Sequence, residues 1–248
     1  MQVNYKAESI KPYNDTDSKT GQVRQMFDSI APAYDFMNRV MTLGIDRLWR
    51  LKAVRMLGKS QPQHILDVAT GTGDLALLLH RRLKPKQGIV GIDLSEGMLN
   101  VARRKVADAG LADAIAFETG DCLNLRFADG SFDAVTVAYG VRNFEHLDQG
   151  YAEMHRVLAK GGVLCVVELS TPTGWLTRKL YDLYTLHIIP LVGRLVSHDV
   201  RAYRYLPESI AAVPQGEAML NIMRAAGFTE CSYKALTFGT CTIYLATK

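Results

Sequence analysis

ILDVATGTGDLALLL, at residues 65–79, is the stretch that decides the fold. A short apolar run, a turn with Gly71 and Gly73, and a leucine-rich helical run follow one another, which is how a nucleotide-binding α/β unit begins. Glycine suits such a turn because it has no Cβ to block a ligand and adopts positive φ without strain. Taken alone, the pattern is equally consistent with a plain tight turn. The dinucleotide fingerprint needs a third glycine, but Ala76 stands in its place, so a dinucleotide is not favoured.

Beyond this stretch, short apolar runs alternate with amphipathic helices, the order that builds a parallel sheet covered on both faces. We expect the first five strands at Ile65–Ala69, Ile89–Asp93, Ile115–Glu118, Ala134–Ala138 and Val163–Leu169. A helix near Glu217–Ala226 and two β-rich runs joined at Gly239 complete the pattern. The fold class is therefore α/β, a mostly parallel seven-stranded sheet with an antiparallel last strand and helices on both faces, as in class I S-adenosylmethionine-dependent methyltransferases.

The segments around the sheet divide one domain into four parts. Residues 1–20 are polar and we expect them to form a loose arm, whereas residues 21–57 have helical spacing broken at Pro32 and Gly44. The segment after Pro172 is longer than an ordinary crossover. The single domain, 1–248, thus comprises an N-terminal helical segment at 1–60, a cofactor-binding core at 61–172, a substrate-side helical insert at 173–215, and a closing helix and hairpin at 216–248.

The composition of the chain bears on its size as a domain, its partners and its location in the cell. With 248 residues, 48% of them hydrophobic, the chain can bury one sizeable core. The net charge of +4 is spread in short pairs, which is a weak signal for acidic partners and typical of a solvated surface. The amino terminus lacks a signal-peptide pattern and no apolar run is long enough to cross a bilayer, so we expect a cytoplasmic protein. Cysteine and histidine spacings match no metal motif, and we expect no bound metal.

Two carboxylates follow the order of the strands. Asp67 lies in the first strand end, where it would repel a pyrophosphate and attract the ammonium group of a methionine. Asp93 ends the second strand about twenty residues after the glycine turn, the position of a ribose-binding carboxylate in such folds. Asp93 could instead cap the next helix, but Ser95 suits that role better.

Asp121 extends this series at the end of the third strand. Its carboxylate could accept a hydrogen bond from adenine N6, and the Cys122 N–H could meet a ring nitrogen. Alone, an aspartate here would usually be a turn residue. Because the carboxyl ends of parallel strands bind ligands in open α/β sheets, the whole series predicts an S-adenosylmethionine site.

The fourth strand ends in AYGVRN, residues 138–143. Arg142 and Asn143 follow the strand, and the acidic–aromatic motif common among N-methyltransferases is absent. A guanidinium beside an amide favours an oxygen-rich substrate held as an anion. The structural alternative is an ion pair between Arg142 and a nearby carboxylate such as Glu145.

With these motifs in view, the chain resembles the ubiquinone/menaquinone biosynthesis C-methyltransferase family over nearly its whole length. The resemblance extends through FDSIAPAYDFMNRVMTLGIDRLWR at 27–50, DVATGTGDLAL at 67–77, AYGVRNFEHLDQGYAEMHRVLAKGG at 138–162 and HIIPLVGRLVSHDVRAYRYLPESI at 187–210. It implies that the cofactor contacts include Thr72, Asp93, Asp121 and Cys122. It also implies that Tyr34, Arg142 and Asn143 act on the quinol ring. Ala138 stands where family members often have serine, which puts a hydroxyl contact to the cofactor there in doubt.

The resemblance implies methylation of a ring carbon of a polyprenylated quinol, with demethylmenaquinol favoured over the benzoquinol of ubiquinone biosynthesis. Two other classes stay open: an RNA or small-molecule methyltransferase of the same fold, and a cofactor-binding scaffold without catalysis. No dense basic patch with interleaved aromatics supports RNA, so no nucleic-acid partner is expected.

The insert carries an apolar surface with basic margins. This surface suits a prenyl tail or peripheral contact with a membrane, while an extra core helix or a homodimer contact explains it equally well. Its apolar residues are Trp175, Leu176, Leu180, Leu183, Tyr184, Ile188, Ile189, Leu191 and Val192, and its basic ones are Arg178, Lys179 and Arg194.

Overall fold

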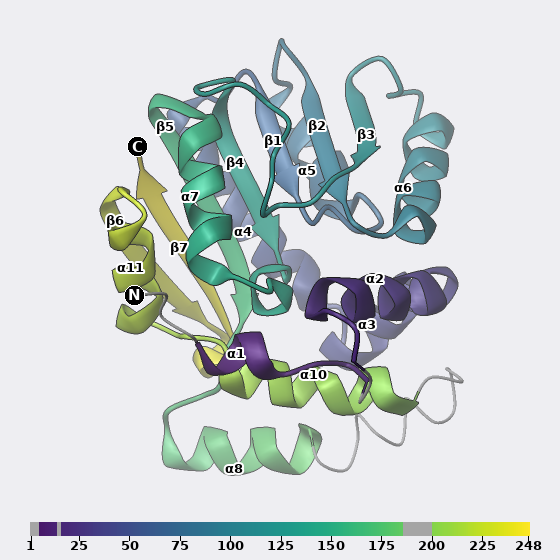
Figure 1. The fold of residues 1–248 in the computed structure, drawn as a ribbon, viewed down its shortest axis with the longest axis vertical. Helices are drawn as coiled ribbons and strands as arrows, with labels where there is room; N and C mark the ends of the chain where they lie inside the picture. The colour runs from purple at the N-terminus through teal and green to yellow at the C-terminus, as the bar shows by residue number, and fades with distance from the viewer. Residues whose placement is uncertain (1–4, 14–15, 186–199) are drawn as a thin grey trace.

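The computed structural model describes residues 5–13, 16–185 and 200–248 and shows a seven-stranded sheet in the order β3-β2-β1-β4-β5-β7-β6 (Figure 1). The strands are β1 (Ile65–Val68), β2 (Ile89–Asp93), β3 (Ile115–Thr119), β4 (Phe132–Ala138), β5 (Leu158–Leu169), β6 (Thr229–Leu236) and β7 (Cys241–Thr247). Pairs among β1 to β5 are parallel, and β7 is antiparallel to both β5 and β6. This arrangement confirms the expected fold class.

Helices cover both faces of the sheet because its central strands are apolar on both sides. Ile65 of β1 packs with the first covering pair, α4 (Asp46–Leu57) and α5 (Asp74–Leu83). Leu66 points the other way and packs with α7 (Leu147–Val157) and α11 (Glu217–Ala225). A strand whose successive side chains are both buried must be near-continuously apolar, as the expected strands were.

A layer of further helices lies at the end of the sheet where β4 finishes (Figure 1). These helices are α1 (Lys6–Ser9), α2 (Lys19–Ile30), α3 (Tyr34–Thr42), α8 (Trp175–Leu183) and α10 (Val200–Ala212), and α6 (Glu96–Asp108) packs beside them at the β3 edge. Pro32 separates α2 from α3 and Gly44 separates α3 from α4, as the sequence indicates. The layer therefore covers the carboxyl ends of the parallel strands.

The amino-terminal segment differs from expectation. We expected residues 1–20 to form a loose arm, but the described part of that range packs onto the fold. Ala7 is fully buried, and the Glu8 carboxylate accepts the Leu147 backbone N–H at 2.8 Å. Lys19 is also buried, and its Nζ donates to the carbonyl oxygens of Ala7 and two residues of the Arg142 loop. Polar composition was misleading because these polar groups are paired inside the protein.

Candidate active site

Two main cavities adjoin at the carboxyl ends of the strands. The larger, of about 300 Å³, lies mostly among α2, α3, α4, α8 and α10, and the smaller, of about 60 Å³, follows the ends of β2, β3 and β4. A third cavity of about 40 Å³ borders the glycine turn. Tyr34 and Tyr139 line all three cavities, and Asn143 lines the first two. The point where the cavities meet is thus marked by two tyrosines and an asparagine.

The smaller cavity holds two of the three carboxylates in the predicted series, Asp93 and Asp121, whereas Asp67 lines the third cavity. Asp93 Oδ2 accepts the Gly71 N–H at 2.8 Å and Oδ1 accepts the Ser95 N–H at 2.9 Å. Burial raises the pKa of Asp93 to about 6, and Asp28 nearby adds to the rise. Ser95 Oγ accepts the Met98 N–H at 3.1 Å, so Ser95 is the cap of α6. Asp93 is free of that role and lines the cavity.

The two glycines of the turn meet different surroundings. Both have positive φ, +56° at Gly71 and +77° at Gly73. A Cβ on Gly73 would lie 2.9 Å from the Phe117 ring and 3.0 Å from Ala102 Cβ, so this glycine allows α5 to pack closely. A Cβ on Gly71 would meet no atom of the described residues within 4 Å, and Gly71 lines the same cavity as Asp93. The backbone at Gly71 is therefore open to the smaller cavity, which Gly71 lines.

Asp121, Cys122 and Ala138 also line the smaller cavity. Asp121 Oδ1 accepts the Leu123 N–H at 2.9 Å, which fixes the carboxylate in a turn. Burial raises the pKa of the Cys122 thiol well above its ordinary value, so this cysteine stays a neutral thiol. Ala138 presents only a methyl group at a position where a hydroxyl would have been a hydrogen-bonding partner.

Asp67 and Thr72 border the third cavity, at the glycine turn. Each Asp67 oxygen accepts a hydroxyl at 2.6 Å, one from Thr70 and the other from Thr136. Burial raises the pKa of Asp67 to about 6 despite these bonds. Thr72 Oγ1 donates to the Asp35 carboxylate at 2.6 Å. Both side chains already have partners from the protein, and they line a different cavity from Asp121.

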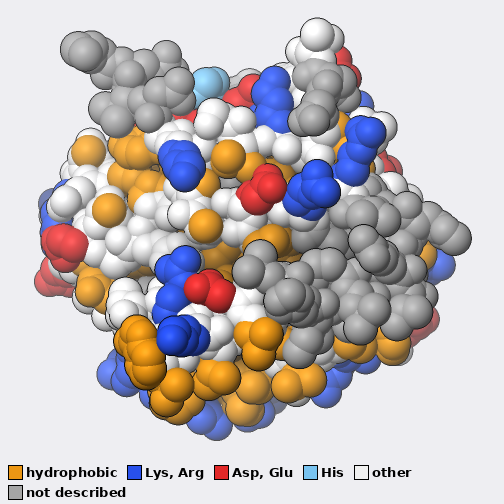
Figure 2. Space-filling model, turned by 90° about the horizontal axis from the view of Figure 1, so that it is seen from below, with side chains coloured by type: hydrophobic (Ala, Val, Ile, Leu, Met, Phe, Trp, Pro, Cys, Tyr) orange, Lys and Arg blue, Asp and Glu red, His pale blue; other side chains and the backbone are white. Residues whose placement is uncertain are grey.

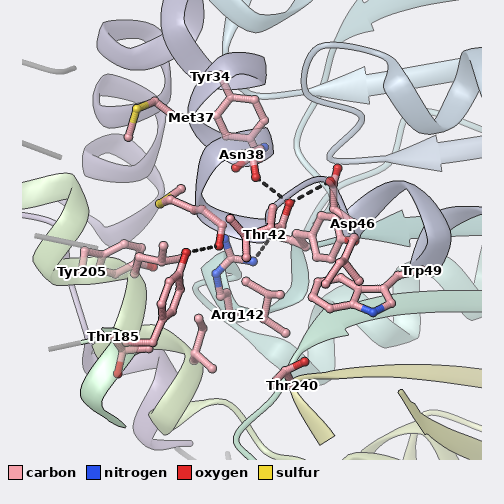
Figure 3. Close-up of a pocket in the computed structure, with 18 of the residues that line it drawn as sticks. Tyr34, Met37, Asn38, Thr42, Asp46, Trp49, Arg142, Thr185, Tyr205 and Thr240 are labelled. Atoms are coloured by element: carbon pink, nitrogen blue, oxygen red, sulfur yellow. Dashed lines mark hydrogen bonds between the residues drawn. The ribbon is translucent and has the colours of Figure 1, made fainter. Parts of the chain in front are cut away.

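Arg142 is a buried cation at the wall of the larger cavity (Figure 3). Its Nη1 donates to Glu168 at 2.9 Å and also to the Tyr139 carbonyl, and its backbone N–H donates to Glu168 at 3.1 Å. Burial opposes the charge, but the surrounding groups, Glu168 first among them, together outweigh it and the pKa of Arg142 is raised. Nε makes no hydrogen bond with any described residue. The guanidinium is thus fixed at one nitrogen and keeps unused donors.

The structural alternative, an ion pair between Arg142 and a carboxylate, is present in the structure, but Glu145, the carboxylate suggested for it, is not the partner. Glu145 instead accepts the backbone N–H groups of Lys19 and Thr20 and the Thr20 hydroxyl. The actual partner, Glu168, was missed, although its charge stands in the apolar run VLCVVEL of β5. A charge in a doubly covered strand is a signal for a buried ion pair.

Tyr34 and Asn143 are the other two residues expected to contact the quinol ring. The Tyr34 ring packs edge-on against Phe27 with centroids 6.0 Å apart, and burial raises its pKa. Asn143 Oδ1 accepts the Tyr205 hydroxyl at 3.0 Å, which links the strand end to α10. The structure thus brings Tyr34, Arg142 and Asn143 to one cavity wall, as their assignment to one site requires.

Tyr139 is a lining residue that sequence reasoning missed. It has φ +59°, and Ala69 on the neighbouring strand end has φ +51°. A left-handed backbone at a residue with a side chain costs energy, and such strain concentrates at functional sites. Here the strain turns the chain sharply at the ends of β1 and β4, where all three cavities meet. Nothing in the residue types signals it.

The chain matches a family model and named relatives over nearly its whole length. The model of the ubiE/COQ5 methyltransferase family matches residues 15–248. Demethylmenaquinone methyltransferase of Bacteroides fragilis is 51% identical over 246 residues, covering 99% of this chain and 100% of the relative. The ubiquinone/menaquinone biosynthesis C-methyltransferase UbiE of Geobacter sulfurreducens is 43% identical, covering 93% of this chain and 90% of the relative.

Solved structures share the fold at low sequence identity. An S-adenosylmethionine-dependent methyltransferase from Thermotoga maritima superposes with a TM-score of 0.64 at 20% identity, covering 91% of this chain and 99% of its own. The [4+2]-cyclase SpnF superposes with a TM-score of 0.65 at 18% identity, covering 92% of this chain and 96% of its own. The fold alone therefore does not define the reaction. The family match over nearly the full length carries more, and by it the chain belongs to the ubiE/COQ5 methyltransferase family.

Proposed function

We propose that this chain transfers a methyl group from S-adenosylmethionine to a ring carbon of a polyprenylated quinol, with demethylmenaquinol as the substrate in menaquinone biosynthesis. The observation that carries the proposal is a buried arginine with unused donors on the wall of a mainly apolar cavity, next to the carboxylate-lined cleft. An apolar cavity with few polar groups suits a lipid ring, and the guanidinium suits its oxygen. The relatives named for demethylmenaquinone support the same assignment.

The residues of the cleft would hold the cofactor in a consistent order. Asp93 would accept the ribose hydroxyls, Asp121 and the Cys122 N–H would meet the adenine, and the bare backbone at Gly71 would allow close approach. Thr72 and Asp67 would lie toward the amino-acid end. When bound, S-adenosylmethionine supplies an electrophilic methyl group on its sulfonium.

Residues of the larger cavity would prepare the quinol. Arg142 would hold the quinol oxygen as it gains negative charge, because a buried guanidinium stabilises a phenolate strongly in a water-poor site. Asn143 and Tyr34 would fix the ring where the cavities meet, so that the ring carbon beside the ionised oxygen faces the cleft. Glu168 would keep Arg142 in place through its two hydrogen bonds.

Helix α8 presents one side to the larger cavity and the other to the surface. Its cavity side carries Tyr181, and Tyr184 just beyond it donates to the Met41 carbonyl at 2.6 Å. Its other side exposes apolar residues, and Lys179 lies over the ring of one of them, Trp175. Figure 2 shows hydrophobic side chains gathered on this face with Lys and Arg side chains nearby, which would suit peripheral contact with an anionic membrane. Ile188, Ile189, Leu191, Val192 and Arg194, expected in the same surface, lie outside the described residues. No helix in the described part of the chain has the length and apolarity of a membrane span.

The proposed function is tested by measuring methyl-transfer rates to a panel of acceptor substrates. We expect transfer of a labelled methyl group to demethylmenaquinol at least tenfold faster than to the benzoquinol analogue, and none to total RNA. Arg142→Ala should lower kcat about 100-fold or more at saturating quinol, since loss of one such donor has that size of effect. Transfer to RNA alone, or an unchanged kcat in Arg142→Ala, would contradict the proposal.

A further inference from the structure

The proposed reaction needs a group that takes the quinol hydroxyl proton, and few candidates line the larger cavity. Of the described residues that line it, Asp46 is the only carboxylate, and no histidine or lysine is among them. The five lining tyrosines all have pKa values raised by burial, so they remain protonated; they are Tyr34, Tyr139, Tyr181, Tyr184 and Tyr205. Asp46 is therefore the lining group best suited to accept a proton.

The Arg142 pair is unsuited to this task. A guanidinium has no lone pair to accept a proton in a protein, and the pKa of Arg142 is raised further by its surroundings. Its partner Glu168 already accepts the Arg142 side chain, the Arg142 backbone N–H and the Leu169 N–H. Glu168 is also not among the residues that line the cavity. This pair can stabilise an anion but does not generate one.

The hydrogen bonds around Asp46 can serve both of its protonation states. Thr42 Oγ1 lies 2.8 Å from Asp46 Oδ1 and 2.7 Å from the Asn38 carbonyl oxygen, although a hydroxyl has one hydrogen (Figure 3). When Asp46 is ionised, Thr42 donates to it. When Asp46 holds a proton, Asp46 donates to Thr42, and the hydroxyl hydrogen turns to Asn38. Neither state leaves one of these groups without a partner.

The charge that faces Asp46 comes from Arg50 on its own helix, and Arg50 in turn contacts Asp74 and Tyr139 on two other elements. Arg50, one turn along α4, pairs with Asp46 Oδ2 and also lies 3.3 Å from Asp74 of α5. The Arg50 guanidinium stands over the Tyr139 ring, 5.8 Å from its centroid. Asp46 in turn helps to raise the pKa of the Tyr139 hydroxyl. A carboxylate has about four lone-pair sites, so these contacts leave lone pairs that can accept a hydrogen bond from a substrate hydroxyl in the cavity.

We propose that Asp46 is the catalytic base that removes the quinol hydroxyl proton, an inference that rests on the proposed function. The proton moves to the Asp46 carboxylate, and the electron pair of the O–H bond stays on oxygen and delocalises to the neighbouring ring carbon. After that carbon gains the methyl group, its own hydrogen leaves as a proton to water, the electron pair of the C–H bond restores the aromatic phenolate, and Asp46 returns its proton to the phenolate oxygen. Overall, quinol and S-adenosylmethionine give methylquinol, S-adenosylhomocysteine and one proton.

The test compares wild type with Asp46→Asn between pH 6 and pH 10, using demethylmenaquinol and the full chain. We expect kcat of the variant to fall 100- to 10,000-fold at pH 7, the usual contribution of a general base. The residual rate should rise about tenfold per pH unit, because the quinol must then ionise without help. Affinity for S-adenosylhomocysteine, measured by calorimetry, should stay within threefold of wild type and shows that the variant is folded.

The outcomes separate the two proposals. A wild type inactive on every quinol overturns the proposed function. An active wild type with a variant whose pH profile keeps the wild-type shape, or whose kcat stays within tenfold, overturns the role of Asp46. If Asp46→Asn does not bind S-adenosylhomocysteine, the variant Thr42→Val is tested in its place. A five- to tenfold loss of kcat in Thr42→Val that Thr42→Ser does not show would support the hydrogen bond between Thr42 and Asp46 as part of the proton transfer. An unchanged kcat in Thr42→Val would overturn the role of Asp46.

Discussion

Individual residues at the glycine turn combine two separate requirements. Gly73 has Phe117 and Ala102 packed against it, whereas Gly71 faces open space and the Asp93 carboxylate. The residue type is the same, but the first serves packing between α5 and α6 and the second serves access to the cleft. Substitutions at these two positions should therefore affect different measurements.

Alanine substitutions separate the two glycines. Gly73→Ala should lower the free energy of unfolding by about 2–4 kcal/mol, because it adds overpacking to the strain of positive φ. Gly71→Ala should cost only about 1–2 kcal/mol in unfolding but weaken S-adenosylhomocysteine binding tenfold or more. Urea unfolding and calorimetric titration of both variants would check this. A Gly71→Ala variant that binds as tightly as wild type would show that no ligand approaches that position.

Asp93 should make cofactor affinity depend on pH. Burial raises its pKa to about 6 in the free protein, and ribose hydroxyls that donate to it favour the ionised form. Affinity for S-adenosylhomocysteine should therefore be full above pH 7 and fall as pH drops through 6, reaching about tenfold weaker at pH 5. Titrations from pH 5 to 8 measure this. The Asp93→Asn variant should bind weakly with much less pH dependence, and an equally steep dependence in that variant would assign the titration elsewhere.

Among the elements, α8 is unusual because its exposed face is the apolar one. Trp175, Leu176, Leu180 and Leu183 are 57–73% exposed, while Tyr181 faces the larger cavity. Lys179 Nζ stands 4.4 Å from the centre of the Trp175 ring. In Figure 2 hydrophobic side chains gather on this lower face with Lys and Arg side chains beside them. The element thus lies between the cavity and a surface that suits a lipid phase.

The membrane proposal predicts a lipid effect that depends on this face. The double variant Leu176→Ser, Leu180→Ser should reduce co-sedimentation with phosphatidylglycerol vesicles at least fivefold. The reason is that two leucine side chains that would be buried in the lipid are lost. The same variant should keep wild-type turnover on a water-soluble, short-tailed quinol. Thr177→Ser on the same helix is the matched control. Unchanged vesicle binding, or a dimer in light scattering that the double variant dissolves, would assign the face to a protein contact instead.

For the whole molecule, the sequence was sufficient where the determinants are local. The positions of the strands along the chain, the Asp93 spacing and the Ser95 cap follow from patterns within about thirty residues, and each agrees with the structure. The placement of Tyr34 beside Arg142 came from family resemblance, because residues so far apart in the chain have no local pattern that joins them.

The parts not predicted depend on contacts between distant segments. Glu168 pairs with Arg142 across 26 residues, and Tyr139 has a positive φ of +59° that its residue type does not favour. The buried position of Lys19 depends on carbonyl groups of α1 and of the loop after β4. Such pairings are decided by the assembled helical layer, which periodicity and composition do not specify.

The position of the transferred methyl group tests the central claim most directly. Wild-type protein would be incubated with demethylmenaquinol and S-adenosylmethionine carrying a ¹³C-labelled methyl group, and the product examined by carbon NMR and mass spectrometry. The account predicts a single label on a ring carbon, seen as an aryl methyl resonance. A label found as a methoxy group, or no labelled quinol while another class of acceptor is methylated, would contradict it.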